Sequence, residues 1–345
     1  MKAEQCKQLA LGRRDVLRLG LLAGLAGLSG CGGNVTNPLL RATPETLPAS
    51  WRRLLPSPWR YQPLVAQAGQ QPFTEALKQG ADLLALSDGW LTSLPEQQLQ
   101  PIATAPLEQR LDAQAKAFLD SLTPSMASRV LPVGVSPWVM VFRQGDPWLK
   151  EARNGWQVLL DPGLKGQLVL PNSPRLLMAL ADRMEAGDGL RRLLDQAITF
   201  DERYGLNWLL HGDARAAVLP LQRCLPSLRR DPRLSVVLPE SGAPLHWTVL
   251  VRSDATREPV PQSWVEQAWS SPLLKQLLAN GWIPPLSRAE LQPAIRSIPK
   301  PYQQIVLPSD QVWSRCWSLP PLTLEEQAEL EQRWSKDSAL QRLTP

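Results

Sequence analysis

Short apolar runs that alternate with helix-like segments limit the fold of this chain more than any other feature of its sequence. One run, Asp82-Leu83-Leu84-Ala85-Leu86, lies between Gly80 and the turn-forming residues Ser87-Asp88-Gly89. An apolar run of this length, bounded by turn residues, is typical of a strand that is covered on both faces in a parallel sheet. The alternation of such strands with helices predicts an α/β architecture.

The predicted elements follow one another from residue 39 to residue 335. We expect strands over residues 39–43, 59–65, 82–86, 167–170, 216–221, 234–238 and 246–252, and a long extended segment over 131–142. We expect helices over residues 47–55, 72–79, 107–122, 124–130, 272–280 and 322–335, and one that closes at 208–210.

Two helix starts carry strong local signals. Ser173 is a helix N-cap residue and Pro174 suits the first helical position, so we expect a helix that begins there and ends before Gly187. Thr323 and Glu326 have the spacing of a capping box at the start of the last helix.

The first thirty residues have the charge order of an export signal. Arg13 and Arg14 precede an apolar, glycine-rich stretch over residues 19–28. This stretch is shorter than the roughly 20 apolar residues that a membrane-spanning helix needs. The two arginines resemble a twin-arginine export signal, although Gly12 and Val16 depart from its usual pattern. An ordinary Sec signal with two adjacent arginines is the alternative.

The apolar stretch ends in Leu28-Ser29-Gly30-Cys31, which resembles the lipobox of bacterial lipoproteins. The resemblance implies that residues 1–30 are removed, that Cys31 is lipidated, and that residues 31–38 form a tether. Because several acyl chains anchor a protein durably, we expect a periplasmic protein that is held at the membrane by lipid.

The charge balance argues against a nucleic-acid-binding protein. The whole chain has a formal net charge of +5, but residues 1–30 hold five of its Lys and Arg and two of its Asp and Glu, so a chain processed at Cys31 carries about +2. We expect no nucleic-acid partner and a monomer.

Neither the cysteines nor the histidines of the processed chain form a recognisable reactive or metal-binding pattern. Cys224 and Cys316 remain after processing, and either one disulfide or two buried thiols suits them. His211 and His246 lie far apart and have no acidic neighbours at ligand spacing. No nucleophile elbow, phosphate loop or metalloprotease motif is present. We expect a protein that is not an enzyme and that holds no metal or cofactor.

Three stretches resemble the family-1 extracellular solute-binding proteins, especially their spermidine/putrescine branch, and they occur in the same order. They are residues 81–87, residues 156–175, and the Gly281-Trp282-Ile283-Pro284-Pro285 segment. The resemblance implies a type II periplasmic-binding-protein fold, with two α/β lobes around a ligand cleft. It also implies the extracytoplasmic binding component of an ABC importer, whose partners are a small solute and the permease subunits.

The domain boundaries that this resemblance implies follow the predicted elements. Lobe 1 is expected to be discontinuous, over residues 39–130 and 248–320, and lobe 2 is expected over residues 131–247. The chain would cross between the lobes near residues 131–138 and 241–247. Residues 321–345 are expected to hold a C-terminal helix.

The candidate ligand site lies where predicted strands end, since ligands of open α/β sheets bind outside the carboxyl ends of strands. Plain turns and core tryptophans are the alternative explanation of the same residues. The candidates are Ser87, Asp88 and Trp90 after the buried strand, Trp138 on the extended segment, Asn172 and Ser173 before a helix, and His246 and Trp247 on the returning strand.

This sequence departs from polyamine-binding proteins in the number of acidic residues expected near the solute. Such proteins surround ammonium groups with carboxylates, because an unpaired buried charge is costly. Here Asp88 is the one carboxylate expected near the site, while Trp90, Trp138 and Trp247 would suit a single cationic or flat organic solute. The scarcity of acids also motivates a second hypothesis, a lipoprotein that kept the fold, lost transport, and acts as a structural or assembly factor at the membrane surface.

Overall fold

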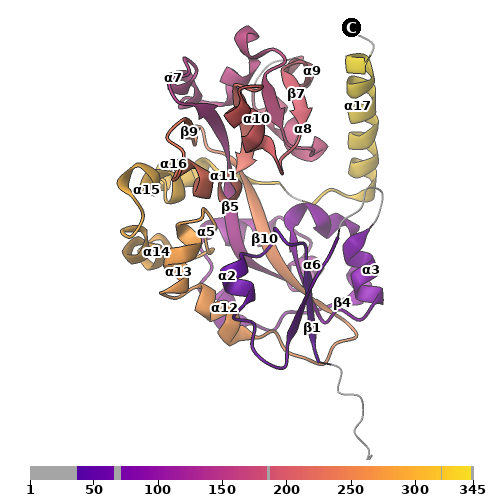
Figure 1. The fold of residues 1–345 in the computed structure, drawn as a ribbon. Helices are drawn as coiled ribbons and strands as arrows, with labels where there is room; N and C mark the ends of the chain where they lie inside the picture. Colours follow the sequence, from indigo (N-terminus) through magenta and orange to yellow (C-terminus); the bar gives the residue numbers. More distant parts are fainter. Residues whose placement is uncertain (1–36, 66–70, 185–186, 320, 343–345) are drawn as a thin grey trace, which may run out of the picture. The chain divides into compact units, whose positions relative to one another are not determined.

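A mixed β-sheet, whose two halves share strand β5 (Val130–Arg143), organises the structure (Figure 1). The computed structural model describes residues 37–65, 71–184, 187–319 and 321–342, with only the backbone described for residues 324 and 336–342. The main path of the sheet runs β2-β1-β3-β10-β5-β8-β6-β7. The α/β class expected from the sequence is confirmed.

The first half of the sheet combines parallel and antiparallel pairs. β1 pairs in parallel with both β2 and β3, whereas β10 pairs antiparallel with β3. The buried strand expected over residues 82–86 therefore has one parallel and one antiparallel neighbour. The strands of this half are β1 (Leu39–Ala42), β2 (Arg60–Pro63), β3 (Leu83–Ser87), β4 (Leu99–Gln100), β10 (Pro244–Ser253) and β11 (Trp317–Ser318).

The second half of the sheet is built on the carboxyl end of β5. There β5 pairs antiparallel with β8 and β9, and β6 joins β8 to β7 by parallel pairing. The strands of this half are β6 (Leu168–Leu170), β7 (Ala197–Phe200), β8 (Ala216–Pro220) and β9 (Leu234–Val237).

The two predicted crossing segments lie side by side in the sheet. Val130–Pro137 of β5 pairs antiparallel with Leu245–Val251 of β10, and from Trp138 onward β5 pairs with the second half instead. The extended segment predicted over 131–142 is thus one continuous strand. The second crossing segment becomes strand from Pro244 onward.

Helices cover both halves. In Figure 1 the helices α12 to α16 gather on one side of the first half, and α8, α9 and α10 surround the second half. The helices of the first half are α2 (Ala49–Arg52), α3 (Pro72–Lys78), α4 (Ala105–Glu108), α5 (Ala113–Asp120), α6 (Pro124–Ala127), α12 (Gln262–Ala268), α13 (Leu273–Leu278), α14 (Arg288–Ile295), α15 (Lys300–Val306) and α16 (Asp310–Arg315), with 3₁₀ turns η1 (Asp88–Ser93) and η2 (Glu96–Gln98). Those of the second half are α7 (Leu149–Ala152), α8 (Pro174–Asp182), α9 (Gly189–Asp195), α10 (Gly205–His211) and α11 (Leu221–Leu228), with η3 (Trp156–Leu160) and η4 (Pro162–Leu164).

The single helix predicted over residues 107–122 is wrong, because two helices occupy this region. Asp112 separates α4 from α5, and its side chain accepts a hydrogen bond from the backbone N–H of Ala115 at 2.8 Å. An N-cap aspartate starts a new helix because it satisfies a free N–H group of the first turn. The helix predicted over 124–130 is also shorter, since β5 already begins at Val130.

The C-terminal helix α17 (Leu324–Arg342) begins with the predicted capping box. Thr323 donates its backbone N–H to Glu326 Oε2 at 2.7 Å, and Glu326 donates its backbone N–H to Thr323 Oγ1 at 3.2 Å. Figure 1 shows α17 beside α8 and α9, and Trp334 meets Phe200 of β7 edge to face at 5.8 Å between ring centroids. The last helix therefore packs on the second half of the sheet.

Half of the fourteen tryptophans that are scattered through the sequence are buried in the core. Trp51, Trp247, Trp264, Trp269 and Trp282 are among the largest fully buried side chains. Cys224 and Cys316 are both buried and free, so the disulfide that was one of the two expectations does not form.

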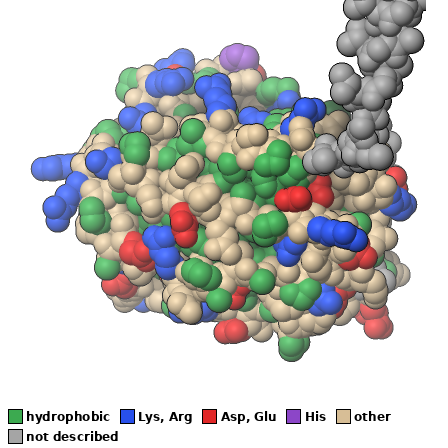
Figure 2. Space-filling model, turned by 90° about the horizontal axis from the view of Figure 1, so that it is seen from below, with side chains coloured by type: hydrophobic (Ala, Val, Ile, Leu, Met, Phe, Trp, Pro, Cys, Tyr) green, Lys and Arg blue, Asp and Glu red, His purple; other side chains and the backbone are tan. Residues whose placement is uncertain are grey.

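Pro38–Pro345 forms one compact unit. Among the described residues, no helix combines the length and apolar character that a membrane crossing requires. The predicted signal peptide, with Arg13 and Arg14, and the predicted lipidation site at Cys31 lie outside the described residues. Figure 2 shows acidic and basic side chains interspersed on one face of the molecule.

Candidate functional site

Asp88 lies at the carboxyl end of β3, as the sequence predicts, and it is almost completely buried. The antiparallel pairing places Thr248 opposite Ser87, which brings the next backbone N–H of β10 to the Asp88 carboxylate. Asp88 Oδ1 accepts a hydrogen bond from the backbone N–H of Trp247 at 3.0 Å. The sheet register thus fixes the position of this carboxylate.

Arg175 reaches the same carboxylate from the second half of the sheet. Arg175 is the second residue of α8, and its Nη1 lies 3.4 Å from Asp88 Oδ2. The two side chains are 16% and 5% exposed, so the pair is largely shielded from water. Burial lowers the pKa of the Arg175 guanidinium, and the charge of Asp88 partly offsets this effect.

The start of α8 is where the sequence places it. Ser173 caps the helix, and its Oγ accepts a hydrogen bond from the backbone N–H of Leu176 at 3.4 Å. Asn172 is exposed. The Ser173 hydroxyl therefore serves the helix, and Arg175 rather than either predicted residue contacts Asp88.

His246 and Trp138 lie together on neighbouring strands. Their rings meet edge to face with 5.8 Å between centroids. Part of the His246 side chain reaches solvent, but the surrounding protein lowers its pKa, chiefly by burial. Asp88 and Glu202 oppose this lowering, whereas Arg223 adds to it. Burial thus favours the neutral imidazole, and charged groups of both signs act on it.

The three tryptophans predicted to surround a solute occupy different environments. Trp247 is fully buried and stacks on Phe118, with ring centroids 5.0 Å apart, and its Nε1 donates to Ser318 Oγ at 2.8 Å. Trp138 is also buried. Trp90 is half-buried and lies tilted over Phe73, with a centroid distance of 5.4 Å. Trp247 consequently contributes its backbone N–H to the site, while its ring belongs to the core.

In the described part of the chain, two arginines that the sequence does not reveal as site residues form ion pairs between the halves. Besides Arg175, Arg203 between β7 and α10 lies 3.8 Å from Glu45 after β1. The sequence shows Arg175 as a charged residue directly after the Ser173-Pro174 helix start. It does not show the partner of Arg175, because Asp88 is 87 residues away along the chain.

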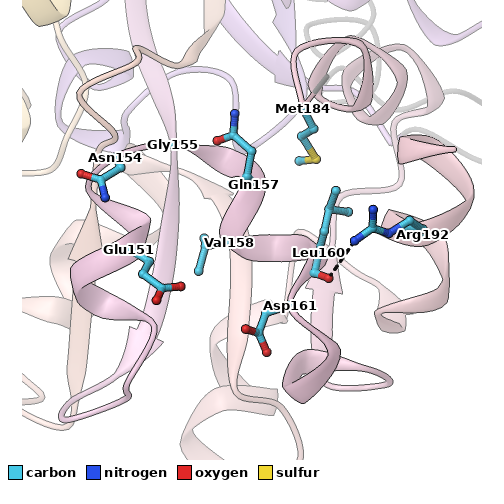
Figure 3. Close-up of a pocket in the computed structure, with 9 residues that line it drawn as sticks. All are labelled: Glu151, Asn154, Gly155, Gln157, Val158, Leu160, Asp161, Met184 and Arg192. Carbon is cyan, nitrogen blue, oxygen red and sulfur yellow. Dashed lines mark hydrogen bonds between the residues drawn. The ribbon is translucent and has the colours of Figure 1, made fainter. Parts of the chain in front are cut away.

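Two cavities lie away from this site. One of about 470 Å³ is formed by the second half alone, around η3 and the ends of α7, α8 and α9 (Figure 3). In Figure 3, Arg192 points toward Leu160, to whose carbonyl oxygen it donates at 3.5 Å. The other, of about 260 Å³, is mainly apolar and lies between α5, α14 and α16 of the first half. None of the predicted site residues lines either cavity.

The described residues offer no cluster of three or more His, Cys, Asp or Glu side chains that suits a metal ion. Burial raises the pKa of both thiols, to about 11 for Cys316 and further for Cys224. A cysteine nucleophile needs a thiolate, which neither residue provides near neutral pH.

The comparisons with known proteins rest on structure, since no family model and no curated protein matches the sequence. A putative spermidine/putrescine ABC transporter protein from Listeria monocytogenes aligns with a TM-score of 0.64 and 15% identity, over 87% of this chain and 98% of that chain. The Tp0655 (TpPotD) lipoprotein of Treponema pallidum aligns with a TM-score of 0.64 and 11% identity, over 87% and 98%. The spermidine/putrescine ABC transporter substrate-binding protein PotD from Streptococcus pneumoniae, solved with calcium and HEPES, gives 0.63 and 11%, over 88% and 98%. The chain therefore has the type II fold of periplasmic solute-binding proteins.

Proposed function

We propose that this protein is the extracytoplasmic solute-binding component of an ABC importer. The observation that carries the proposal is the meeting of Asp88 and Arg175, which the two halves of a binding-protein fold supply from opposite sides. Ligands of such sheets bind at the carboxyl ends of strands, and Asp88 directly follows β3. The position of this pair supports the proposal.

Closure of the two halves around a solute would report occupancy to a permease. Hinge closure of this kind is an established route by which binding proteins trap ligands. We assign residues 39–130 and 248–320 to one lobe and residues 131–247 to the other, with β5 and β10 as the crossing segments. The proposal also includes an export signal over residues 1–30, a tether over residues 31–38 and a lipid anchor at Cys31. We further propose that the protein is a monomer.

Polyamines are the first solutes to test, because the structural neighbours include polyamine-transport proteins. The site is nevertheless poor in acids for a polycation. Asp88 already accepts a hydrogen bond from Trp247 and contacts Arg175, and Glu202 is the other acid that acts on His246. A solute with a single charged group fits this arrangement better than one with several.

Thermal unfolding in the presence of solutes tests the function. A form of the protein that begins at Asn37 would be heated with polyamines, amino acids, thiamine, dicarboxylates and phosphate compounds. A solute that binds only the native state adds about 2.7 kcal/mol of stability at one hundred times its dissociation constant. We expect one chemical class to raise the melting temperature. An unchanged melting temperature across this panel and across a fractionated extract of small metabolites would contradict the proposal.

A further inference from the structure

The charges at the junction of the two halves indicate what kind of solute the site takes. Arg175 and Arg223 supply positive charge, Asp88 and Glu202 supply negative charge, and burial favours neutral His246. Both oxygens of Asp88 are engaged, one by the Trp247 N–H and one by Arg175. A cation that enters must displace Arg175 from the Asp88 carboxylate and then lie beside the guanidinium. Like charges in a partly dehydrated site repel strongly.

An anion would be attracted by the Arg175 guanidinium, which repels a cation. The guanidinium of Arg175 is a planar group that binds carboxylates and phosphates through two parallel hydrogen bonds. Its contact with Asp88 is 3.4 Å long, whereas charge-assisted hydrogen bonds are typically about 2.7–2.9 Å. Arg175 also lies next to the backbone of Gly89, where a Cβ atom would be 3.9 Å from Nη1. A solute oxyanion would therefore form a shorter contact than Asp88 does.

The two members of the pair are attached to different halves of the molecule. Asp88 is held by the β10 backbone, while Arg175 is carried on α8. When the halves separate, Asp88 cannot follow Arg175 without losing the Trp247 hydrogen bond. Separation would break the contact between Asp88 and Arg175 and would leave the hydrogen-bonded carboxylate on the first half.

We propose that the solute carries a carboxylate or a related oxyanion, which binds Arg175 in place of Asp88. Asp88 then acts as an internal substitute for that anion and holds the halves together when the site is empty. This inference rests on the proposed solute-binding function and names the chemical class of the solute.

Replacement of Asp88 by asparagine separates this inference from cation binding. Asp88→Asn keeps the acceptor for the Trp247 N–H but removes the competing charge. Anion binding should become tighter, by about tenfold or more, because the internal competitor is weakened. A cation-binding site would instead lose its carboxylate, and binding would weaken. The two models predict changes of opposite sign, and a folding defect does not produce tighter binding.

Arg175→Gln is the complementary variant. It should abolish the effect of anionic solutes on the melting temperature. The matched controls are Glu45→Gln and Arg203→Gln, which neutralise members of a second ion pair between the halves and should leave anion binding unchanged.

The probes are glutamate, succinate, inorganic phosphate, methylphosphonate, putrescine and spermidine, compared at constant ionic strength by melting temperature and then by calorimetric titration. Binding of a carboxylate or a phosphate compound supports the inference if Asp88→Asn strengthens it and Arg175→Gln removes it. Comparison of the carboxylate probes with the phosphate and phosphonate probes shows which oxyanion is bound. Polyamine binding that Asp88→Asn abolishes would overturn it and leave the solute-binding function intact. Anion effects that persist in Arg175→Gln would also overturn it. If no probe and no metabolite fraction binds, the proposed function itself fails.

Discussion

Trp51 and Trp264 each donate an indole hydrogen bond to the backbone carbonyl oxygen of the other, at 2.9 and 3.0 Å. Their rings are stacked with centroids 4.3 Å apart. The reciprocal bonds join α2 near the start of the chain to α12, which lies 213 residues later. Because both indoles are fully buried, each indole N–H depends on the other residue for its hydrogen bond.

Trp264→Phe should lower the free energy of unfolding by about 2 kcal/mol, because it removes one bond and leaves the Trp51 carbonyl buried without that donor. Chemical denaturation followed by circular dichroism measures the change. Trp59→Phe, at a half-buried indole on the margin of the core, is the control and should cost less. Equal losses for both variants would show that ring size, not the reciprocal hydrogen bond, determines the effect.

Gly134→Ala should destabilise the protein by about 3 kcal/mol, the upper part of the usual range for overpacking. A Cβ atom at this position would lie 2.0 Å from Cζ2 of Trp282, whose ring is fully buried. Gly187→Ala is the matched control, since a Cβ atom there meets nothing within 4 Å. A native melting temperature for Gly134→Ala would mean that Trp282 has room to move.

Acidification should destabilise the protein through His246. Its pKa is lowered in the folded state, chiefly by burial, and Asp88, Glu202 and Arg223 are the charged groups that act on it. The unfolded chain therefore binds a proton near pH 6.5 while the folded protein does not, and stability falls as the pH decreases below that value. The slope from this one group is at most about 1.4 kcal/mol per pH unit.

His246→Gln should flatten this dependence between pH 7.5 and 5, measured as the melting temperature in buffers of matched ionic strength. His211→Gln, at an exposed position in α10, is the control and should keep the wild-type slope. A variant slope identical to that of the wild type would exclude His246 as the cause.

The two thiols of the form that begins at Asn37 should resist modification in the native state. Cys224 and Cys316 are free and buried, and burial raises the pKa of both. A maleimide should label neither under native conditions and both in guanidinium chloride, and a reductant should leave the melting temperature unchanged. A non-reduced mass 2 Da lower than the reduced one would reveal a disulfide and contradict the structure.

Local signals predicted a large part of this fold. Ser173 with Pro174, and Thr323 with Glu326, mark helix starts through hydrogen bonds to residues three positions away, so they are readable in sequence. The long apolar segment after Val130 is strand because both of its ends find partners in the sheet. The helix break at Asp112 was missed because apolar residues continue on both sides of it.

The candidate site was only half predictable, because a sequence gives no access to long-range placement. The strand end at Ser87-Asp88 was identified from its turn residues. The contact with Arg175 depends on how α8 packs against the first half, and no local pattern encodes it. The sequence suggests the ring of Trp247 as a ligand contact, yet the strand turns that ring toward Phe118 and presents the backbone N–H to Asp88.

The position of β10 has a consequence for biosynthesis. This strand lies between β3 and β5 in the sheet, but it is translated more than one hundred residues after the start of β5. Until residues 244–253 have left the ribosome, β3 and β5 each lack one of their neighbours, and unpaired strand edges invite association with other chains. The first half can be completed only late in synthesis, so these strand edges stay without their partner until most of the chain has been made.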